Sequence, residues 1–217
     1  GPVWDPFEEL FKIIYLGTAA QDISTLGTGA AVSLDETGAS GTSGNYSCYA
    51  TSKDGVNWEK PFIGLYEYDG KLWDKSPIGT DNNIIPSING HIRGPVYHAT
   101  EPDPNRRFKA QIYRDKALYA AASPDCIHWQ ELDEIPPHDS LDVSELYYDE
   151  TEDLFISTIK HRTYYGRSFF LSTSKDFENW TEQELIFHAD QTDQENGFER
   201  LQKFFDDDRY LTPVHNR

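Results

Sequence analysis

Three stretches of this chain repeat one short pattern: Ser52-Lys-Asp54-Gly-Val-Asn-Trp58, Ser123-Pro-Asp125-Cys-Ile-His-Trp129 and Ser174-Lys-Asp176-Phe-Glu-Asn-Trp180. Each copy follows a run that is typical of a β-strand, at residues 45–51, 117–122 and 167–173. The Asp side chain and the Ser hydroxyl can accept hydrogen bonds from the backbone N–H groups that follow them, which favours a tight turn. The Trp that ends each copy then begins the returning strand and packs beneath the hairpin. Repetition on this scale indicates a repeat architecture.

A second repeat lies upstream of these turns. Residues 1–15 and 145–160 each contain an apolar strand, an acidic turn and a strand that opens with Leu-Phe; residues 94–113 form a third copy, and residues 203–212 begin a fourth. The unit is therefore four antiparallel strands, and its recurrence predicts an all-β fold, a β-propeller of four-stranded blades. The predicted parts are a blade at 1–61, an insertion at 62–90, blades at 91–132 and 139–186, and the start of a further blade at 199–217.

This single predicted propeller domain, 1–217, starts and stops in the middle of a blade. A propeller protects its terminal sheets by closing on itself. The sequence also contains no Met among its 217 residues. We therefore expect that the chain is part of a longer protein or that residues are missing from the sequence.

The composition excludes several classes of partner. A net charge of -18 argues against nucleic acid and anionic membranes. No apolar run approaches the ~20 residues of a membrane span. The two cysteines do not make a disulfide framework, and no metal-ligand spacing or cofactor motif is present. We expect a secreted or periplasmic protein without a metal or cofactor.

The innermost strand of each propeller blade lines the central channel, so the polar residues at its start are candidates for a functional site. Carboxylates from different strands would then face one space. Cleavage of a glycosidic bond requires such a pair, one protonated as the acid and one ionised as base or nucleophile. Acidic residues number 37 of 217, however, so any stretch before a strand would contain some. The catalytic candidates are Glu145, Asp142, Glu199 and Asp139.

A basic group lies in Lys160-His-Arg162-Thr-Tyr-Tyr-Gly-Arg167, after the second strand of the third blade. These cations could bind hydroxyls, a uronate carboxylate, a sulfate or a phosphate, because Arg makes bidentate contacts with such groups. Alternatively, they pair with neighbouring acidic turns on a hairpin, which contributes little energy. The candidates for substrate binding are Asn83, His91, Arg93, Lys160, Arg162 and Arg167.

These motifs together resemble the five-bladed β-propeller glycoside hydrolases, a superfamily with invertase-like and arabinanase-like enzymes, and in particular a bacterial branch of it. The strings that carry the resemblance are at 49–61, 82–85, 106–109, 123–129 and 166–180. The resemblance implies five blades when complete and acid/base hydrolysis of an oligo- or polysaccharide. It also implies three catalytic carboxylates, of which Glu145 matches the general acid on the third blade. Where the family has an Asp on the second blade, this chain reads Val96-Tyr-His98.

Two other functions remain open on the same fold. A glycoside phosphorylase would use inorganic phosphate as nucleophile, held by Lys160, His161, Arg162 and Arg167, and would need only one acid. A non-catalytic propeller that binds a glycan or a protein would keep the aromatic and cationic residues but would have no pair of carboxylates across the channel.

Overall fold

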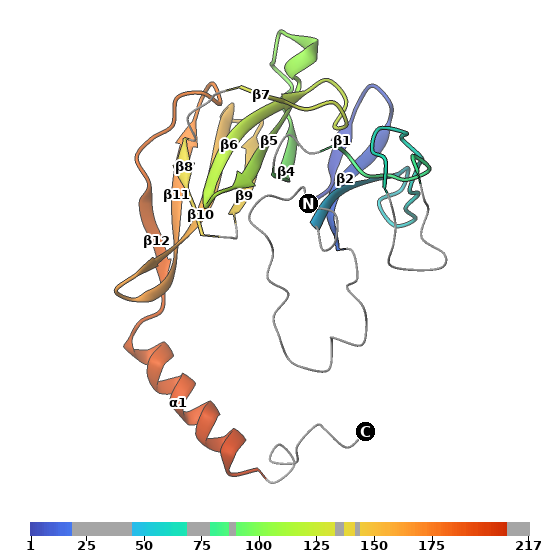
Figure 1. Cartoon of the computed structure of the whole chain (residues 1–217). Coiled ribbons are helices and arrows are strands. Elements are labelled where there is room, and N and C mark those ends of the chain that lie inside the picture. The colour runs from blue at the N-terminus through green and yellow to red at the C-terminus, as the bar shows by residue number, and fades with distance from the viewer. Residues whose placement is uncertain (19–44, 69–78, 87–89, 133–136, 142–143, 208–217) are drawn as a thin grey trace.

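The computed structural model describes six stretches of the chain: residues 1–18, 45–68, 79–86, 90–132, 137–141 and 144–207. They form three antiparallel sheets and one α-helix (Figure 1). The first sheet contains β1 (Val3–Asp5), β2 (Leu10–Thr18) and β3 (Asn45–Ser52). Isolated bridges join Thr51 to Glu59 and Cys48 to Ile84, so two further short segments pair with the outer edge of this sheet, at β3.

The second and third sheets have the predicted four-stranded pattern. The second contains β4 (His91–Tyr97), β5 (Phe108–Arg114), β6 (Ala117–Ser123) and β7 (Gln130–Glu131), with β8 (His138–Asp139) also paired to β6. The third contains β9 (Ser144–Asp149), β10 (Leu154–Thr163), β11 (Gly166–Ser174) and β12 (Glu184–His188). A short 3₁₀ helix, η2 (Pro104–Arg106), lies in the turn before β5. Within each sheet, consecutive strands are paired in a meander, except that β8 pairs with β6 and not with β7.

The sheets stand side by side, from β1 and β2 on the right of Figure 1, through β4–β6, to β9–β12 on the left. The sheets meet at β4, which packs against the three strands of the first sheet and against β9, the first strand of the third. A separate cluster of buried side chains fills each of the two interfaces between sheets. One cluster joins Val3 and Tyr49 to Phe108 and Trp129, and the other joins Ala120 to Phe155 and Phe177. The predicted all-β, propeller-like fold is confirmed.

The repeated Ser-x-Asp pattern forms the predicted turns. In the first copy, Asp54 Oδ1 accepts hydrogen bonds from the N–H groups of Val56 and Asn57, at 2.9 and 2.8 Å. The fourth position of each copy has a positive φ, which Gly adopts without strain: 75° at Gly55 and 67° at Cys126. The Trp residues also fix the turn, since Trp129 Nε1 donates to the Cys126 carbonyl at 2.9 Å.

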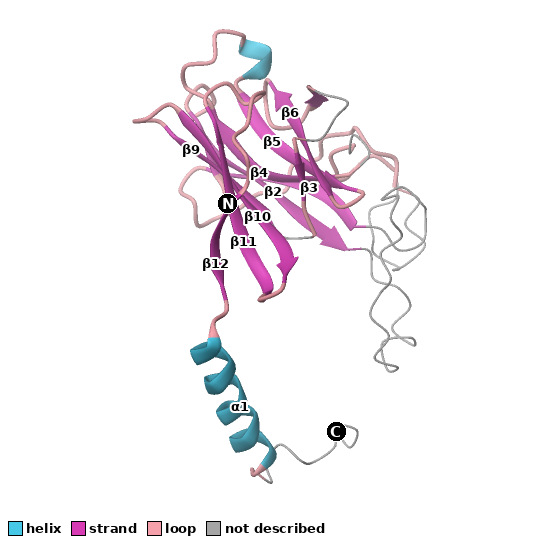
Figure 2. Cartoon of the chain, turned by 90° about the vertical axis from the view of Figure 1, so that its left-hand side faces the viewer, coloured by secondary structure: helices cyan, strands magenta, loops and turns pink. Residues whose placement is uncertain are grey.

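The end of the described chain differs from the prediction. Instead of starting a further blade at 199–217, residues 191–205 form the helix α1 (Gln191–Phe205), which extends away from the sheets in Figure 2. Asp190 and Asp193 cap its N-terminus reciprocally, and its three Gln and two Glu are good helix formers. Residues 208–217, the rest of the predicted strand, lie outside the described residues.

The boundary between the second and third blades also differs from the predicted 139. His138 and Asp139 pair with Leu118 and Ala117 of β6, so they continue the outer edge of the second sheet. The third sheet begins at Ser144. The one described α-helix, α1, is not long and apolar enough to cross a membrane.

Candidate functional site

The starts of the inner strands enclose a cavity of about 160 Å³, which we call the rim cavity. All three sheets contribute to it. Its lining residues are Gly1, Ile14, Leu16, Ser47, His91, Ile92, Arg93, Gly94, Ser144 and Glu145. Three residues predicted from the sequence, Glu145, His91 and Arg93, therefore meet at one place on the rim.

Close approach of β4 and β9 shapes this cavity. Gly94 has a φ of 57°, and a Cβ atom added to it would lie 2.9 Å from the backbone nitrogen of Leu146. The register of β4 against β5 shifts between Arg93 and Val96, which is a bulge at Gly94 and Pro95. Such a bulge redirects the side chains next to it. Only Gly permits both the backbone conformation and the contact between these two strands.

His91 is mostly neutral at pH 7. Burial lowers the pKa of its imidazole, and the positive charge of Arg93 lowers it further. His91 Nδ1 is buried and has no hydrogen-bond partner among the described residues. The Arg93 guanidinium lies over the ring of Tyr113, 5.1 Å from its centroid, and the Tyr113 hydroxyl donates to the Leu141 carbonyl. Arg93 is thereby fixed beside the cavity as a permanent cation.

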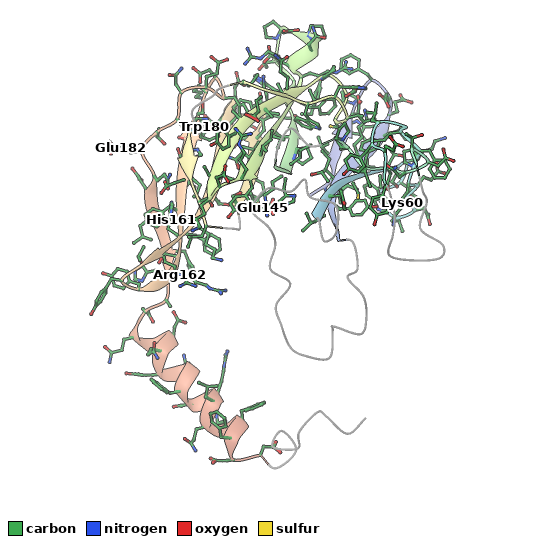
Figure 3. The ribbon with its side chains drawn as sticks, viewed as in Figure 1. Lys60, Glu145, His161, Arg162, Trp180 and Glu182 are labelled. Atoms are coloured by element: carbon green, nitrogen blue, oxygen red, sulfur yellow. The ribbon has the colours of Figure 1, made fainter. Side chains whose placement is uncertain are left out.

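Glu145 is the only carboxylate in the described lining of the rim cavity, and its side chain is exposed to solvent. It lies on β9 opposite Thr158 of β10. Because side chains alternate along a strand, Thr158, Lys160 and Arg162 occupy the same face of the third sheet as Glu145. Figure 3 shows Glu145 and Arg162 at the same lower end of the sheets.

Two of the other catalytic candidates are not at the cavity. Asp139 is on β8, where it accepts a hydrogen bond from Gln183 at 3.3 Å and lies 3.9 Å from His161. Glu199 is exposed on α1. Asp142 lies outside the described residues. Several carboxylates were expected to converge. Among the described residues, Glu145 is the only one of the catalytic candidates at the cavity.

The candidates for substrate binding also separate into groups. The side-chain amide of Asn83 donates to the Tyr49 carbonyl at 2.6 Å and to the Tyr15 hydroxyl at 2.9 Å, so it holds the first sheet together. Lys160 is buried on β10. Arg162 and Arg167 are exposed and lie opposite each other near the end of the β10–β11 hairpin.

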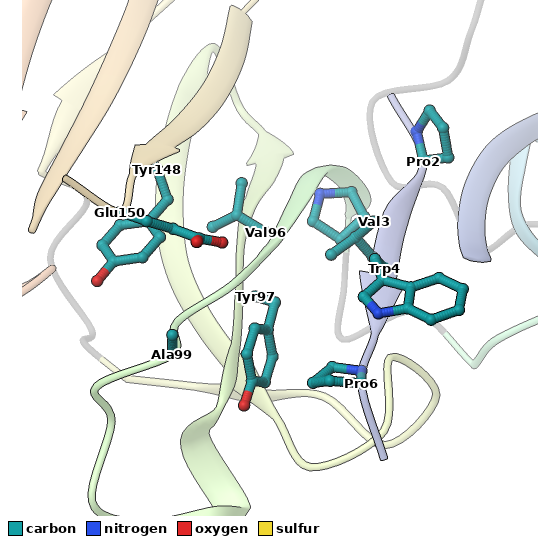
Figure 4. Close-up of a pocket in the computed structure, with 10 residues that line it drawn as sticks. Pro2, Val3, Trp4, Pro6, Val96, Tyr97, Ala99, Tyr148 and Glu150 are labelled. Carbon is teal, nitrogen blue, oxygen red and sulfur yellow. The ribbon is translucent and has the colours of Figure 1, made fainter. Parts of the chain in front are cut away.

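A second cavity, of about 420 Å³, lies where the inner strands end, at the opposite rim (Figure 4). Each inner strand contributes an aromatic side chain, Trp4, Tyr97 and Tyr148, and Glu150 is the carboxylate beside them. Sequence reasoning missed this cavity, although an aromatic residue ends each inner-strand motif. Among the described residues, no group of three or more His, Cys, Asp or Glu side chains could hold a metal ion.

No protein-family model matches the chain, and no curated protein matches it. Solved structures do. An N-acetylgalactosamine deacetylase from F. plautii, in complex with blood group B trisaccharide, is 17% identical with a TM-score of 0.50, covering 87% of this chain and 52% of that one. The fold resemblance is confirmed.

Two further solved structures are similar at lower scores. A beta-fructofuranosidase from Schwanniomyces occidentalis, complexed with fructosyl-erythritol, is 13% identical with a TM-score of 0.48, covering 87% of this chain and 33% of that one. A glycosyl hydrolase from Bacteroides ovatus is 13% identical with a TM-score of 0.41, covering 87% and 48%. The chain spans about half the length of the F. plautii enzyme and a third of the fructofuranosidase.

Proposed function

We propose that this protein is a glycan-processing hydrolase that cleaves a glycosidic bond by carboxylate acid/base chemistry. The observation that carries the proposal is the rim cavity, where Glu145, His91 and Arg93 meet at the start of two inner strands. The F. plautii enzyme, half of which matches this chain, is in complex with a trisaccharide, and this supports carbohydrate as the ligand class here.

Three lining residues of the rim cavity have roles in this proposal, together with Asp142. Glu145 acts as the general acid and donates a proton to the leaving-group oxygen as the glycosidic bond breaks. Asp142, three residues earlier in the sequence, activates the water or attacks the anomeric carbon. Neutral His91 exchanges hydrogen bonds with sugar hydroxyls, and Arg93 donates to hydroxyl or carboxylate oxygens. Asp139 and Glu199 have no part in the reaction.

Replacement of the acid tests the proposal. Glu145→Gln removes the proton donor but keeps the size of the side chain, so turnover of polysaccharides or aryl glycosides should fall roughly 10²–10⁴-fold. Circular dichroism and the midpoint of thermal unfolding should not change, because Glu145 is exposed. Glu150→Gln is the matched control, since Glu150 lies at the opposite rim. Near-normal turnover by Glu145→Gln would remove this residue from the mechanism.

Phosphorolysis is a second candidate, and the single described carboxylate beside Arg93 favours it. A phosphorylase needs one acid and a cationic site for the attacking phosphate. Cleavage of a glycoside that requires inorganic phosphate, and that releases a sugar phosphate, would separate this reaction from hydrolysis. Cleavage at full rate without phosphate would exclude it.

A further inference from the structure

The β10–β11 hairpin extends beyond the rim that contains Glu145. The last pair between β9 and β10 joins Ser144 to Ile159, whereas β10 and β11 remain paired as far as Thr163 and Gly166. The hairpin therefore continues four residues past the start of β9, or about 13 Å at the usual rise of a strand. This distance is longer than one sugar ring.

The end of this hairpin carries two arginines in direct opposition. Arg162 and Arg167 are partners in the register of β10 and β11, and both are exposed. Like charges directly opposite each other destabilise a sheet. Neither guanidinium forms an ion pair with a residue that the structure describes. In a chain with 37 acidic and 19 basic residues, this pair indicates an anionic partner.

Aromatic side chains occupy the turn beside the arginines. Tyr164 is 100% exposed, and the Tyr165 ring stacks on His188 with centroids 4.2 Å apart. The turn is held in place by the Thr163 hydroxyl, which accepts from the Tyr165 N–H at 3.1 Å and lies 2.8 Å from the Ser168 hydroxyl. An exposed Tyr offers an apolar face to the C–H groups of a sugar and a polar tip to its hydroxyls.

A cavity of about 450 Å³ lies between this turn and the start of α1. Polar side chains in its lining can form hydrogen bonds with sugar hydroxyls. The Asp190 carboxylate already accepts a hydrogen bond from the Asp193 N–H, at 3.0 Å, as the helix cap. The lining residues that matter here are Tyr164, Tyr165, His188, Asp190, Gln191 and Gln194.

We propose that the end of the β10–β11 hairpin, with the cavity beside it, binds an acidic sugar unit of the substrate at a distance from Glu145. Arg162 and Arg167 bind its carboxylate or sulfate, and Tyr164 packs against a sugar ring. The fork of a guanidinium matches either anion. This inference rests on the proposed function, because it requires that one glycan reaches from the hairpin to the rim cavity where it is cleaved.

Calorimetric titration tests the inference with three defined probes: tetragalacturonate, a sulfated galactan tetrasaccharide of carrageenan type, and neutral galactotetraose. The protein should bind at least one of the charged probes tenfold or more tightly than galactotetraose. The charged probe that binds distinguishes a uronate from a sulfate ester. Equal or weaker binding of both charged probes would overturn the inference.

Variants localise the site. Arg162→Gln with Arg167→Gln should weaken binding of the charged probe at least tenfold and leave galactotetraose unaffected. Arg200→Gln with Lys203→Gln removes the same charge from exposed positions on α1 and should change binding less than twofold. Equal loss in both double variants, or no loss in the first, would overturn the inference. Thermal unfolding of all variants verifies that they fold.

The two proposals fail in different ways, because the titrations can be repeated with the Glu145→Gln variant, whose turnover is expected to be strongly reduced. If a charged probe binds tightly but Glu145→Gln turns over substrate at the wild-type rate, only the catalytic proposal is overturned. Glu145-dependent turnover of neutral glycans, with no preference for the charged probes, would overturn only the inference about the hairpin.

Discussion

At the residue scale, one carboxylate organises each Ser-x-Asp turn. Hydrogen bonds from Asn57 hold the pKa of Asp54 far below its ordinary value, although that side chain is exposed. The same bonds recur at Asp176, whose Oδ1 accepts from the Asn179 N–H at 2.7 Å. Cys126 and Phe177 adopt the positive φ that Gly55 adopts freely, so the hydrogen bonds and packing of these two copies outweigh backbone strain.

Asp125 tests this function of the turn. Its Oδ1 accepts from the N–H groups of Ile127 and His128 at 2.9 and 2.8 Å. Burial opposes its charge, but the bonds from His128 outweigh burial and lower the pKa of Asp125. Asp125→Ala should therefore reduce the free energy of unfolding by about 2 kcal/mol at pH 7. Urea denaturation measures this, with the exposed Glu182→Ala as control.

The effect of Asp125→Ala should depend on pH in one direction. Because the folded-state pKa of Asp125 is lowered, its stabilisation is complete above its ordinary pKa of 3.8 and disappears as the pH falls through the folded value. A difference between wild type and variant that grows on acidification would contradict this account.

At the element scale, buried lysines connect neighbouring sheets. Lys12 on β2 bonds to Asp5 at 2.7 Å and to the Asp125 carbonyl at 3.1 Å, so it joins the first sheet to a turn of the second. Burial opposes the charge on Lys12, but hydrogen bonds to Asp5 and Glu8 outweigh it and raise the pKa of the ammonium group. Lys109 occupies the equivalent place on β5, 2.6 Å from Glu101 and over the ring of Phe177 in the turn after β11.

The contact between β4 and β9 is a second connection between elements, and Gly94 tests it. Gly94→Ala would place a methyl group against Leu146 in addition to straining a φ of 57°. Gly64→Ala is a matched control, because Gly64 has a φ of 70° but no atom within 4 Å of the added Cβ. We expect the control to reduce the free energy of unfolding by about 1 kcal/mol.

Gly94→Ala should reduce stability by at least 1 kcal/mol more than its control, because neither the Leu146 backbone nor its Cβ can move without separating the strands. It should also lower turnover, since this contact shapes the rim cavity. Equal stability losses in the two variants, measured by urea denaturation, would show that β4 and β9 can separate at no cost.

At the scale of the whole molecule, the features that the sequence predicts are those with local causes. Each Ser-x-Asp turn is formed by hydrogen bonds within seven residues, so residues such as Ser123 and Asp125 are enough to predict the turn from the sequence. The site depends on which strands meet. Aligned repeats correctly indicate that Glu145, His91 and Arg93 share a rim, because the inner strands have equivalent places.

Two of the failures have non-local causes. The strand β8 belongs to the second sheet because His138 pairs across to Leu118, a contact that no local pattern reveals. The end of α1 overlaps residues 203–212, which were expected to begin a fourth copy of the repeat from their similarity to the other copies. Asp190 and Asp193 nevertheless carry the capping signal of a helix, and this signal is local. The side-chain amide of Asn83 donates one of its hydrogen bonds to Tyr15, 68 positions away, so its structural role is also non-local.

Buried imidazoles should make the whole molecule sensitive to mild acid. His138 is 2% exposed, and its ring packs against Trp180 with centroids 4.8 Å apart. Burial lowers its pKa from 6.5 to about 4, opposed by the charge of Asp139 and assisted by that of His161. Burial also lowers the pKa of His91 and of His98. At neutral pH the folded state therefore contains these three imidazoles mainly in the neutral form.

The sign of the effect follows from which state binds more protons. Between pH 6.5 and about 4, an unfolded His138 is protonated and the folded one is not, so stability falls as the pH falls through this window. The loss from His138 alone approaches about 3 kcal/mol. His138→Phe keeps the ring contact with Trp180 but cannot titrate. His138→Gln cannot titrate either and also lacks the ring, so it separates the effect of titration from that of ring packing. Urea denaturation at steps from pH 7 to pH 4.5 should show a shallower loss in both variants. A slope equal to that of the wild type would mean that this imidazole reaches water in the folded state, and that the interface between the second and third sheets opens there.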